Sequence, residues 1–158
     1  MSAPAATPRA SRPVALAAVA AVSATALGGC SRAVEVTLPA YANDPACQRV
    51  ATRWPATVTT LDARRVSVDS PAARAWGDPP ILALCGTEPI GPTDRPCLAV
   101  DGVDWVLLPA SDGTRFTTYG RTPAIDVFVP ARYAPEGMVL PSFAAAAQAL
   151  PENGHHCT

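Results

Sequence analysis

The sequence predicts an α+β domain: a mainly antiparallel sheet of four to five strands, with one N-terminal and one C-terminal helix packed on one face. Three observations lead to this fold class. Between residues 81 and 129, short apolar and β-branched segments alternate with turn residues. Apolar residues recur at helical spacing once before these segments and once after them. Strands grouped together in the chain, without helices between them, favour antiparallel pairing.

The beginning of the chain predicts an export signal. Residues 1–12 contain two arginines and no acid, and an apolar run over residues 13–29 ends in Leu27-Gly28-Gly29-Cys30. Small residues before a cysteine are typical of a bacterial lipobox, in which the cysteine thiol is acylated and the chain is cut before it. An uncleaved anchor helix and plain secretion are the alternatives. All three interpretations place the domain outside the cytoplasm.

The expected organisation therefore has three parts. Residues 1–29 form a lipoprotein signal peptide, residues 30–44 form a tether from lipidated Cys30, and residues 45–158 form a single disulfide-stapled domain. The tether is expected to let the domain stand away from the membrane. A chain of 158 residues leaves no room for a second domain of ordinary size.

The first predicted helix begins at Pro45, because Asp44 is a good N-cap and proline is favoured at the first helical position. Its apolar face holds Cys47, Val50, Ala51 and Trp54. Pro55 ends it, since the residue before a proline avoids the helical region. The second predicted helix lies near residues 142–150, with Gly154 just beyond its end.

The strands are expected between the two helices. Residues 64–68 favour a short strand, residues 71–76 one helical turn, and residues 77–80 a proline-containing turn. The principal strands are predicted at residues 81–85, 98–100, 103–108, 114–119 and 124–129. Asp101-Gly102 is a tight-turn dipeptide that joins two of them.

Five cysteines occur in the chain, and acylation of Cys30 would leave four. Four cysteines allow three pairings. The spacing favours Cys85 with Cys97 across the base of a hairpin, and Cys47 with Cys157 between the first helix and the C-terminal tail. An oxidising compartment would make both disulfides stable.

A metal site is the alternative use of Cys157, together with His155 and His156. Neighbouring residues on a tail rarely converge on one ion, and no second ligand pair is present, so no metal is predicted. The sequence contains no phosphate-cradling glycine loop and no nucleophile elbow, so we also predict no cofactor and no catalytic residue. A net charge of −1 gives no basic footprint for nucleic acid.

Carboxylates are the remaining groups that could perform acid–base chemistry. Asp78, Asp101 and Asp104 lie in or beside predicted turns. A paired-carboxylate glycosidase needs two such groups about 5–10 Å apart in a cleft. Aspartates in turns more often bind their own backbone, and this interpretation is favoured here.

Trp76, Asp78, Tyr119 and Arg121 are predicted to form a binding surface on the open sheet face and its loops. Aromatic rings could hold a glycan or peptide, and an arginine could clamp a carboxylate or phosphate. The competing interpretation places Trp76 in the core and Arg121 in a surface salt bridge.

Four strings in the chain carry a resemblance: Trp-Gly-Asp-Pro-Pro at 76–80, Leu-Cys-Gly at 84–86, Gly-Val-Asp-Trp at 102–105, and Phe-Thr-Thr-Tyr-Gly-Arg at 116–121. On these strings, residues 46–157 resemble an uncharacterised actinobacterial family, the "thirty-five-fifteen" domain of unknown function. Its members are similar in layout, with an N-terminal signal, often a lipobox, and one small cysteine-containing domain. The resemblance implies no activity, cofactor or functional residue.

The sequence thus leads us to expect a lipid-anchored lipoprotein on the extracytoplasmic face of the cell membrane. It would contact membrane lipid through Cys30 and bind an envelope protein or a cell-wall component without catalysis. An accessory subunit of a membrane complex and a carboxylate-dependent enzyme acting on the cell wall are the alternatives.

Overall fold

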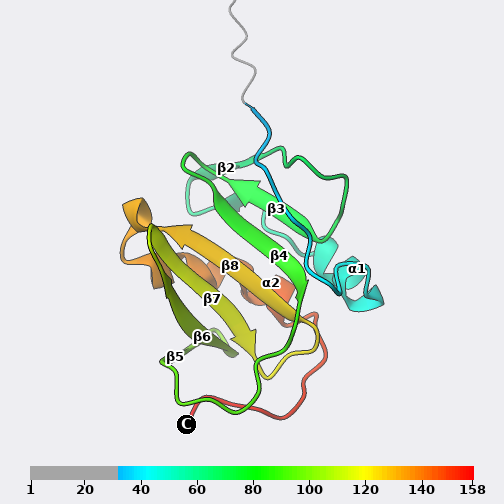
Figure 1. Ribbon diagram of the computed structural model, residues 1–158, viewed down its shortest axis with the longest axis vertical. Coiled ribbons are helices and arrows are strands. Elements are labelled where there is room, and N and C mark those ends of the chain that lie inside the picture. The colour runs from blue at the N-terminus through cyan, green and yellow to red at the C-terminus, as the bar shows by residue number, and fades with distance from the viewer. Residues whose placement is uncertain (1–31) are drawn as a thin grey trace, which may run out of the picture. The chain divides into compact units, whose positions relative to one another are not determined.

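Eight antiparallel strands form one continuous sheet in residues 32–158, the part of the chain that the computed structural model describes (Figure 1). The order across the sheet is β1-β2-β3-β4-β8-β7-β6-β5. The strands are β1 (Thr57–Val58), β2 (Leu61–Arg64), β3 (Ala73–Trp76), β4 (Ile81–Thr87), β5 (Cys97–Val100), β6 (Val103–Ala110), β7 (Gly113–Tyr119) and β8 (Ala124–Pro130). The predicted signal peptide and the lipidated Cys30 lie outside the described residues.

The predicted sheet of four to five strands is therefore wrong. The five strands between residues 81 and 129 are present, but β1, β2 and β3 extend the sheet beyond them. Residues 73–76, expected within a helical turn, form β3 because Arg74 and Trp76 pair with Ala83 and Ile81 of β4. Cross-strand pairing of this kind overrides a weak local preference.

The helices are also much smaller than predicted. Helix α1 (Pro45–Ala51) begins as expected, with the Asp44 side chain accepting a hydrogen bond from the Ala46 amide. At the C-terminal end, two 3-10 helices, η1 (Ala131–Tyr133) and η2 (Glu136–Phe143), lead into α2 (Ala144–Ala147). Pro141 lies within η2 and has no N–H to donate to an α-helical ladder, and α2 contains only four alanines. No helix in residues 32–158 is long and apolar enough to cross a membrane.

The core lies on one face of the sheet. Alternate residues of the central strands β4 and β8 point into it, where they meet buried side chains from α1, η2 and α2. The Trp76 ring meets Phe143 edge to face at 5.4 Å and Trp54 at 6.4 Å. The same alternation sends the other residues of each strand to the opposite, open face.

Residues 32–44, which belong to the predicted tether at residues 30–44, lie against the domain. The Val34 amide donates to the Arg65 carbonyl at 2.9 Å, and the Tyr41 amide donates to the Gly86 carbonyl at 3.0 Å. Figure 1 shows this segment in blue, running across β3 and β4 to α1. Gly86 permits the crossing because an added Cβ would lie 2.4 Å from the backbone of Tyr41. The folded domain thus includes residues that were assigned to the tether.

All four cysteines in the described part of the chain form disulfides, but the predicted pairing is wrong. Cys47 of α1 pairs with Cys85 of β4, and Cys97 of β5 pairs with Cys157 of the tail. The sheet order explains the error. Strands β8, β7 and β6 separate β4 from β5, so Cys85 and Cys97 cannot face each other across a hairpin.

Candidate functional site

The open face of the sheet carries a polar group among apolar side chains. Cross-strand register places Asp126 of β8 opposite Thr117 of β7 and Leu84 of β4. It places Phe128 of β8 opposite Arg115. These residues point away from the core because their neighbours Ile125 and Val127 point into it.

A hollow of about 350 Å³ lies over this group. The N-terminal segment contributes one side of it, and β4, β7 and β8 contribute the rest. Its lining residues are Thr37, Leu38, Pro39, Leu82, Leu84, Thr87, Arg115, Asp126 and Phe128. We call this the Asp126 hollow. Apolar walls around a few convergent polar groups are the usual composition of a small-ligand site.

Two side chains contact the Asp126 carboxylate directly. The Thr117 hydroxyl donates to its Oδ1, and the Arg115 guanidinium lies 3.7 Å from its Oδ2. The pKa of Asp126 is raised above 3.8 because burial desolvates the charged form; hydrogen bonds from Thr117 and Thr87 and the charge of Arg115 oppose this increase. The site therefore offers a hydrogen-bond acceptor shielded from water.

Arg115 complements this acceptor. Its side chain is 54% exposed, whereas that of Asp126 is 12% exposed. The guanidinium can therefore contact a carbonyl or anionic group of a ligand while Asp126 accepts from an amide, amine or hydroxyl. Arg115 and Asp126 together could therefore bind a ligand that has a hydrogen-bond donor next to a hydrogen-bond acceptor.

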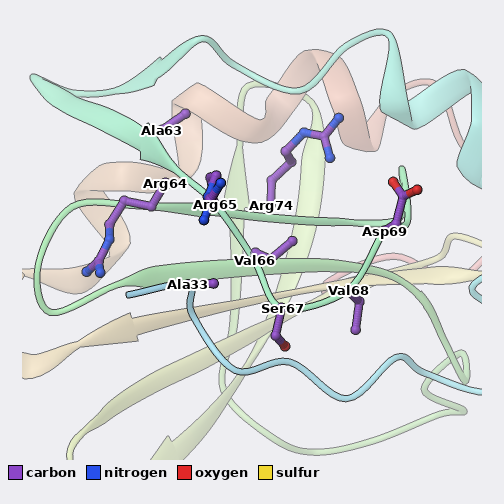
Figure 2. Close-up of a pocket in the computed structure, with 9 residues that line it drawn as sticks. All are labelled: Ala33, Ala63, Arg64, Arg65, Val66, Ser67, Val68, Asp69 and Arg74. Atoms are coloured by element: carbon purple, nitrogen blue, oxygen red, sulfur yellow. The ribbon is translucent and has the colours of Figure 1, made fainter. Parts of the chain in front are cut away.

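A second, shallower hollow of about 730 Å³ lies at the connection between β2 and β3 (Figure 2). Its lining residues are Ala33, Ala63, Arg64, Arg65, Val66, Ser67, Val68, Asp69 and Arg74. We call this the basic hollow. Arg64 donates to the Gly77 carbonyl at 3.1 Å and to Asp78 at 3.2 Å, whereas Arg65 is exposed.

The predicted binding surface does not exist as one patch. Trp76 is fully buried in the core, and its Nε1 donates to the Pro55 carbonyl at 3.2 Å. Asp78 is exposed and pairs with Arg64. Tyr119 and Arg121 lie at the other end of the sheet, 8% exposed each.

The C-terminal tail covers this second pair. The ring of His155 lies 5.6 Å from that of Tyr119. Arg121 forms an ion pair with Glu152 at 3.0 Å and donates to the Leu150 carbonyl at 3.1 Å. Arg121 thus fixes the tail to the sheet, and it is not available to clamp a ligand.

Asp78 lies far from the other two aspartates considered for acid–base chemistry. Asp78 lies in the β3–β4 turn, and Asp101 lies in the β5–β6 turn beyond β8, β7 and β6 in the sheet order. Asp104 accepts from the Cys157 amide at 3.0 Å and lies 3.4 Å from His156. Within residues 32–158, no group of three His, Cys, Asp or Glu side chains is arranged to hold a metal ion.

Sequence reasoning missed the Asp126 hollow. The signal was present in the strand at residues 124–129, where Asp126 stands between inward-facing Ile125 and Val127. An aspartate in the middle of such a strand indicates a polar group on its other face. Its partner Thr117 is nine residues away in sequence and is paired with it only by strand register.

Comparisons with known proteins bear on the family alone. No curated protein and no solved structure matches the chain. One family profile matches residues 4–153, a range that includes all eight strands and ends before Cys157. The chain belongs to the family described as "Protein of unknown function (DUF3515)".

Proposed function

We propose that the protein is a lipid-anchored module of the cell envelope that binds a ligand through the Asp126 hollow and performs no catalysis. The lipobox at residues 27–30 supports the anchor. The two disulfides support an extracytoplasmic location, because such bonds persist in oxidising compartments.

The Asp126 hollow is the observation that carries the binding function. A desolvated carboxylate beside an exposed arginine, within apolar walls, suits a polar ligand that has an N–H donor and a carbonyl or carboxylate acceptor. Peptide and acetylated-sugar fragments of the cell wall carry both groups. We therefore propose cell-wall peptide or glycan as the ligand class.

The test is a titration of the purified protein with defined wall fragments, followed by calorimetry. Asp126→Asn keeps the shape of the side chain and removes its charge, so we expect at least about a tenfold loss of affinity. Asp94→Asn, in the exposed loop between β4 and β5, is the matched control and should bind as the wild type does. Equal binding by the Asp126→Asn protein, or no binding of any fragment, would contradict the proposal.

An accessory subunit of a membrane complex is the second candidate. It is favoured by the contact of residues 34–41 with the domain, which would keep the open sheet face close to an anchor at Cys30. Crosslinking in intact cells should then join the chain to an integral membrane protein through residues of β4, β7 or β8. Crosslinks confined to wall polymer would favour the first candidate.

A further inference from the structure

The first described residues, 32–34, contact the rest of the domain at the basic hollow. The Arg64 guanidinium donates to the Arg32 carbonyl at 3.0 Å. Val34 then forms a parallel bridge with Val66, and the Ser67 amide donates to its carbonyl at 2.8 Å. Figure 2 shows Ala33 beside the chain at Val66 and Ser67, among the lining residues. Residues 32–34 are therefore part of the rim of this hollow.

Chain length then limits where an anchor at Cys30 can be. Only one residue stands between Cys30 and Arg32. Successive Cα atoms are about 3.8 Å apart, so the Cα of Cys30 lies within about 8 Å of the Cα of Arg32. An acylated Cys30 would bring the lipid surface to the rim of the basic hollow.

The charge of the hollow is opposite to that of the domain as a whole. From Cys30 onward the chain has 10 arginines and 13 acidic residues, a net charge of −3. The lining of the hollow has three arginines and one aspartate, and Asp78, which lies outside the lining, pairs with Arg64; counting Asp78, the net charge is +1. Within residues 32–158, no carboxylate lies within 4.0 Å of the guanidinium of Arg65 or Arg74.

We propose that the basic hollow binds the headgroups of anionic phospholipids in the membrane that holds Cys30. This inference rests on the proposed lipid anchor. Guanidinium groups bind phosphate with paired, charge-assisted hydrogen bonds. Arg65 is exposed, and Arg74, whose Nη1 donates to the Ala73 carbonyl at 2.9 Å, also lines the hollow. The headgroups would orient the domain, with this end towards the bilayer.

The test uses the full chain, made in a bacterial host that acylates lipoproteins and then reconstituted into vesicles. One set of vesicles contains phosphatidylcholine alone, and the other contains phosphatidylcholine with phosphatidylglycerol. An arginine-specific dicarbonyl reagent is applied, and modified residues are quantified by mass spectrometry. We expect the modification rate of Arg65 to fall about fivefold in the anionic vesicles, the factor for one basic residue held near such a surface. High salt, at about 0.5 M, should restore the rate by screening.

Arg53 and Arg95 are exposed controls outside the hollow, and their rates should be equal in the two sets of vesicles. A pair of variants sharpens the result. Arg65→Glu should remove the protection of Arg74, and Arg95→Glu should leave it in place. Equal rates at Arg65 in both sets would overturn the proposal.

The anchor and the headgroup site can fail separately. The mass of the N-terminal peptide shows whether Cys30 carries acyl chains. An unmodified Cys30 would overturn both the anchor and this inference, whereas an acylated chain with unprotected Arg65 would overturn this inference alone. Protection of Arg65 in intact cells but not in vesicles would assign the hollow to a protein partner, and would also overturn the lipid site.

Discussion

At the scale of single residues, the fold changes the pKa of the Asp126 carboxyl. Burial raises its pKa, although Thr117 and Arg115 both stabilise the charged form. Because the pKa in the folded state lies above the unfolded value, the folded protein retains this proton to higher pH. The contribution of Asp126 to stability is thus fully present below the unfolded pKa and is lost as pH rises through the folded pKa.

This sign leads to a measurable difference between the wild type and Asp126→Asn. The asparagine does not titrate, so the stability of the wild type relative to the variant should increase as pH falls from about 7 to about 3. Urea unfolding of both proteins across this range gives the difference directly. A constant difference, or one that decreases towards acid pH, would contradict the raised pKa.

Two buried tryptophans allow a test of how much one side-chain hydrogen bond contributes to stability. Both are fully buried, but Trp76 donates its Nε1 hydrogen to Pro55, whereas Trp105 Nε1 has no partner in the described residues. A phenylalanine removes the same volume at either position. Trp76→Phe should therefore reduce the free energy of unfolding by about 1 kcal/mol more than Trp105→Phe, the value of one net hydrogen bond. Equal losses in denaturant titrations would show that the Trp76 bond contributes nothing.

At the scale of elements, the N-terminal segment depends on one close approach of backbone to backbone. Gly86 lies in β4 with φ +105, and its carbonyl accepts from Tyr41. A side chain at this position would meet the backbone of Tyr41 and Ala42 and would strain its own backbone as well. Residues 34–41 can therefore lie against this face of the sheet only because β4 has a glycine at position 86.

Gly86→Ala should lower the free energy of unfolding by about 3 kcal/mol, the combined effect of overpacking and a disfavoured φ. Hydrogen exchange at the Tyr41 amide should become faster, because the segment must move away from β4. Gly91→Ala is the matched control, since nothing lies within 4 Å of an added Cβ there. Its stability should change by less than about 0.5 kcal/mol. Unchanged exchange at Tyr41 in Gly86→Ala would show that the segment is not held by this contact.

Elements were predictable where local signals were strong. The strands between residues 81 and 129 are apolar, β-branched and bounded by turn residues, and the Asp101-Gly102 turn adopts the positive φ values that its sequence favours. Strands β1 to β3 were not predictable, because they are short and exist through pairing with a neighbour. The Asp126 hollow was not assembled from sequence for the same reason: register across three strands brings Asp126, Thr117 and Leu84 together.

At the scale of the whole molecule, the two disulfides join segments that are far apart in the sequence, and local sequence patterns do not predict that these segments meet. Cys47–Cys85 spans 38 residues and Cys97–Cys157 spans 60. In the chain-entropy account, loops of these lengths stabilise the folded state by about 4 kcal/mol each. That is a large share of the stability of an ordinary domain.

Peptide mapping under non-reducing conditions tests this pairing. After denaturation, a protease that cleaves before aspartate should release residues 44–61 linked to residues 78–93, and residues 94–100 linked to residues 126–158. Trypsin is unsuitable, because the Arg95–Pro96 bond resists it and leaves Cys85 and Cys97 in one peptide. A link between residues 78–93 and 94–100 would contradict the structure.

Because of the positions of these two disulfides, the domain can be divided into two fragments that no disulfide joins. One disulfide closes before the exposed connection at residues 88–96 and the other closes after it, so no cystine joins the two halves. A single cut in that connection would leave two internally cross-linked fragments, held to each other by the β4–β8 seam and the shared core. The fragments should separate on a denaturing gel without any reductant. If the two fragments are made as independent chains, we expect them to reassociate through the β4–β8 pairing, which a fluorescent label on each fragment would detect.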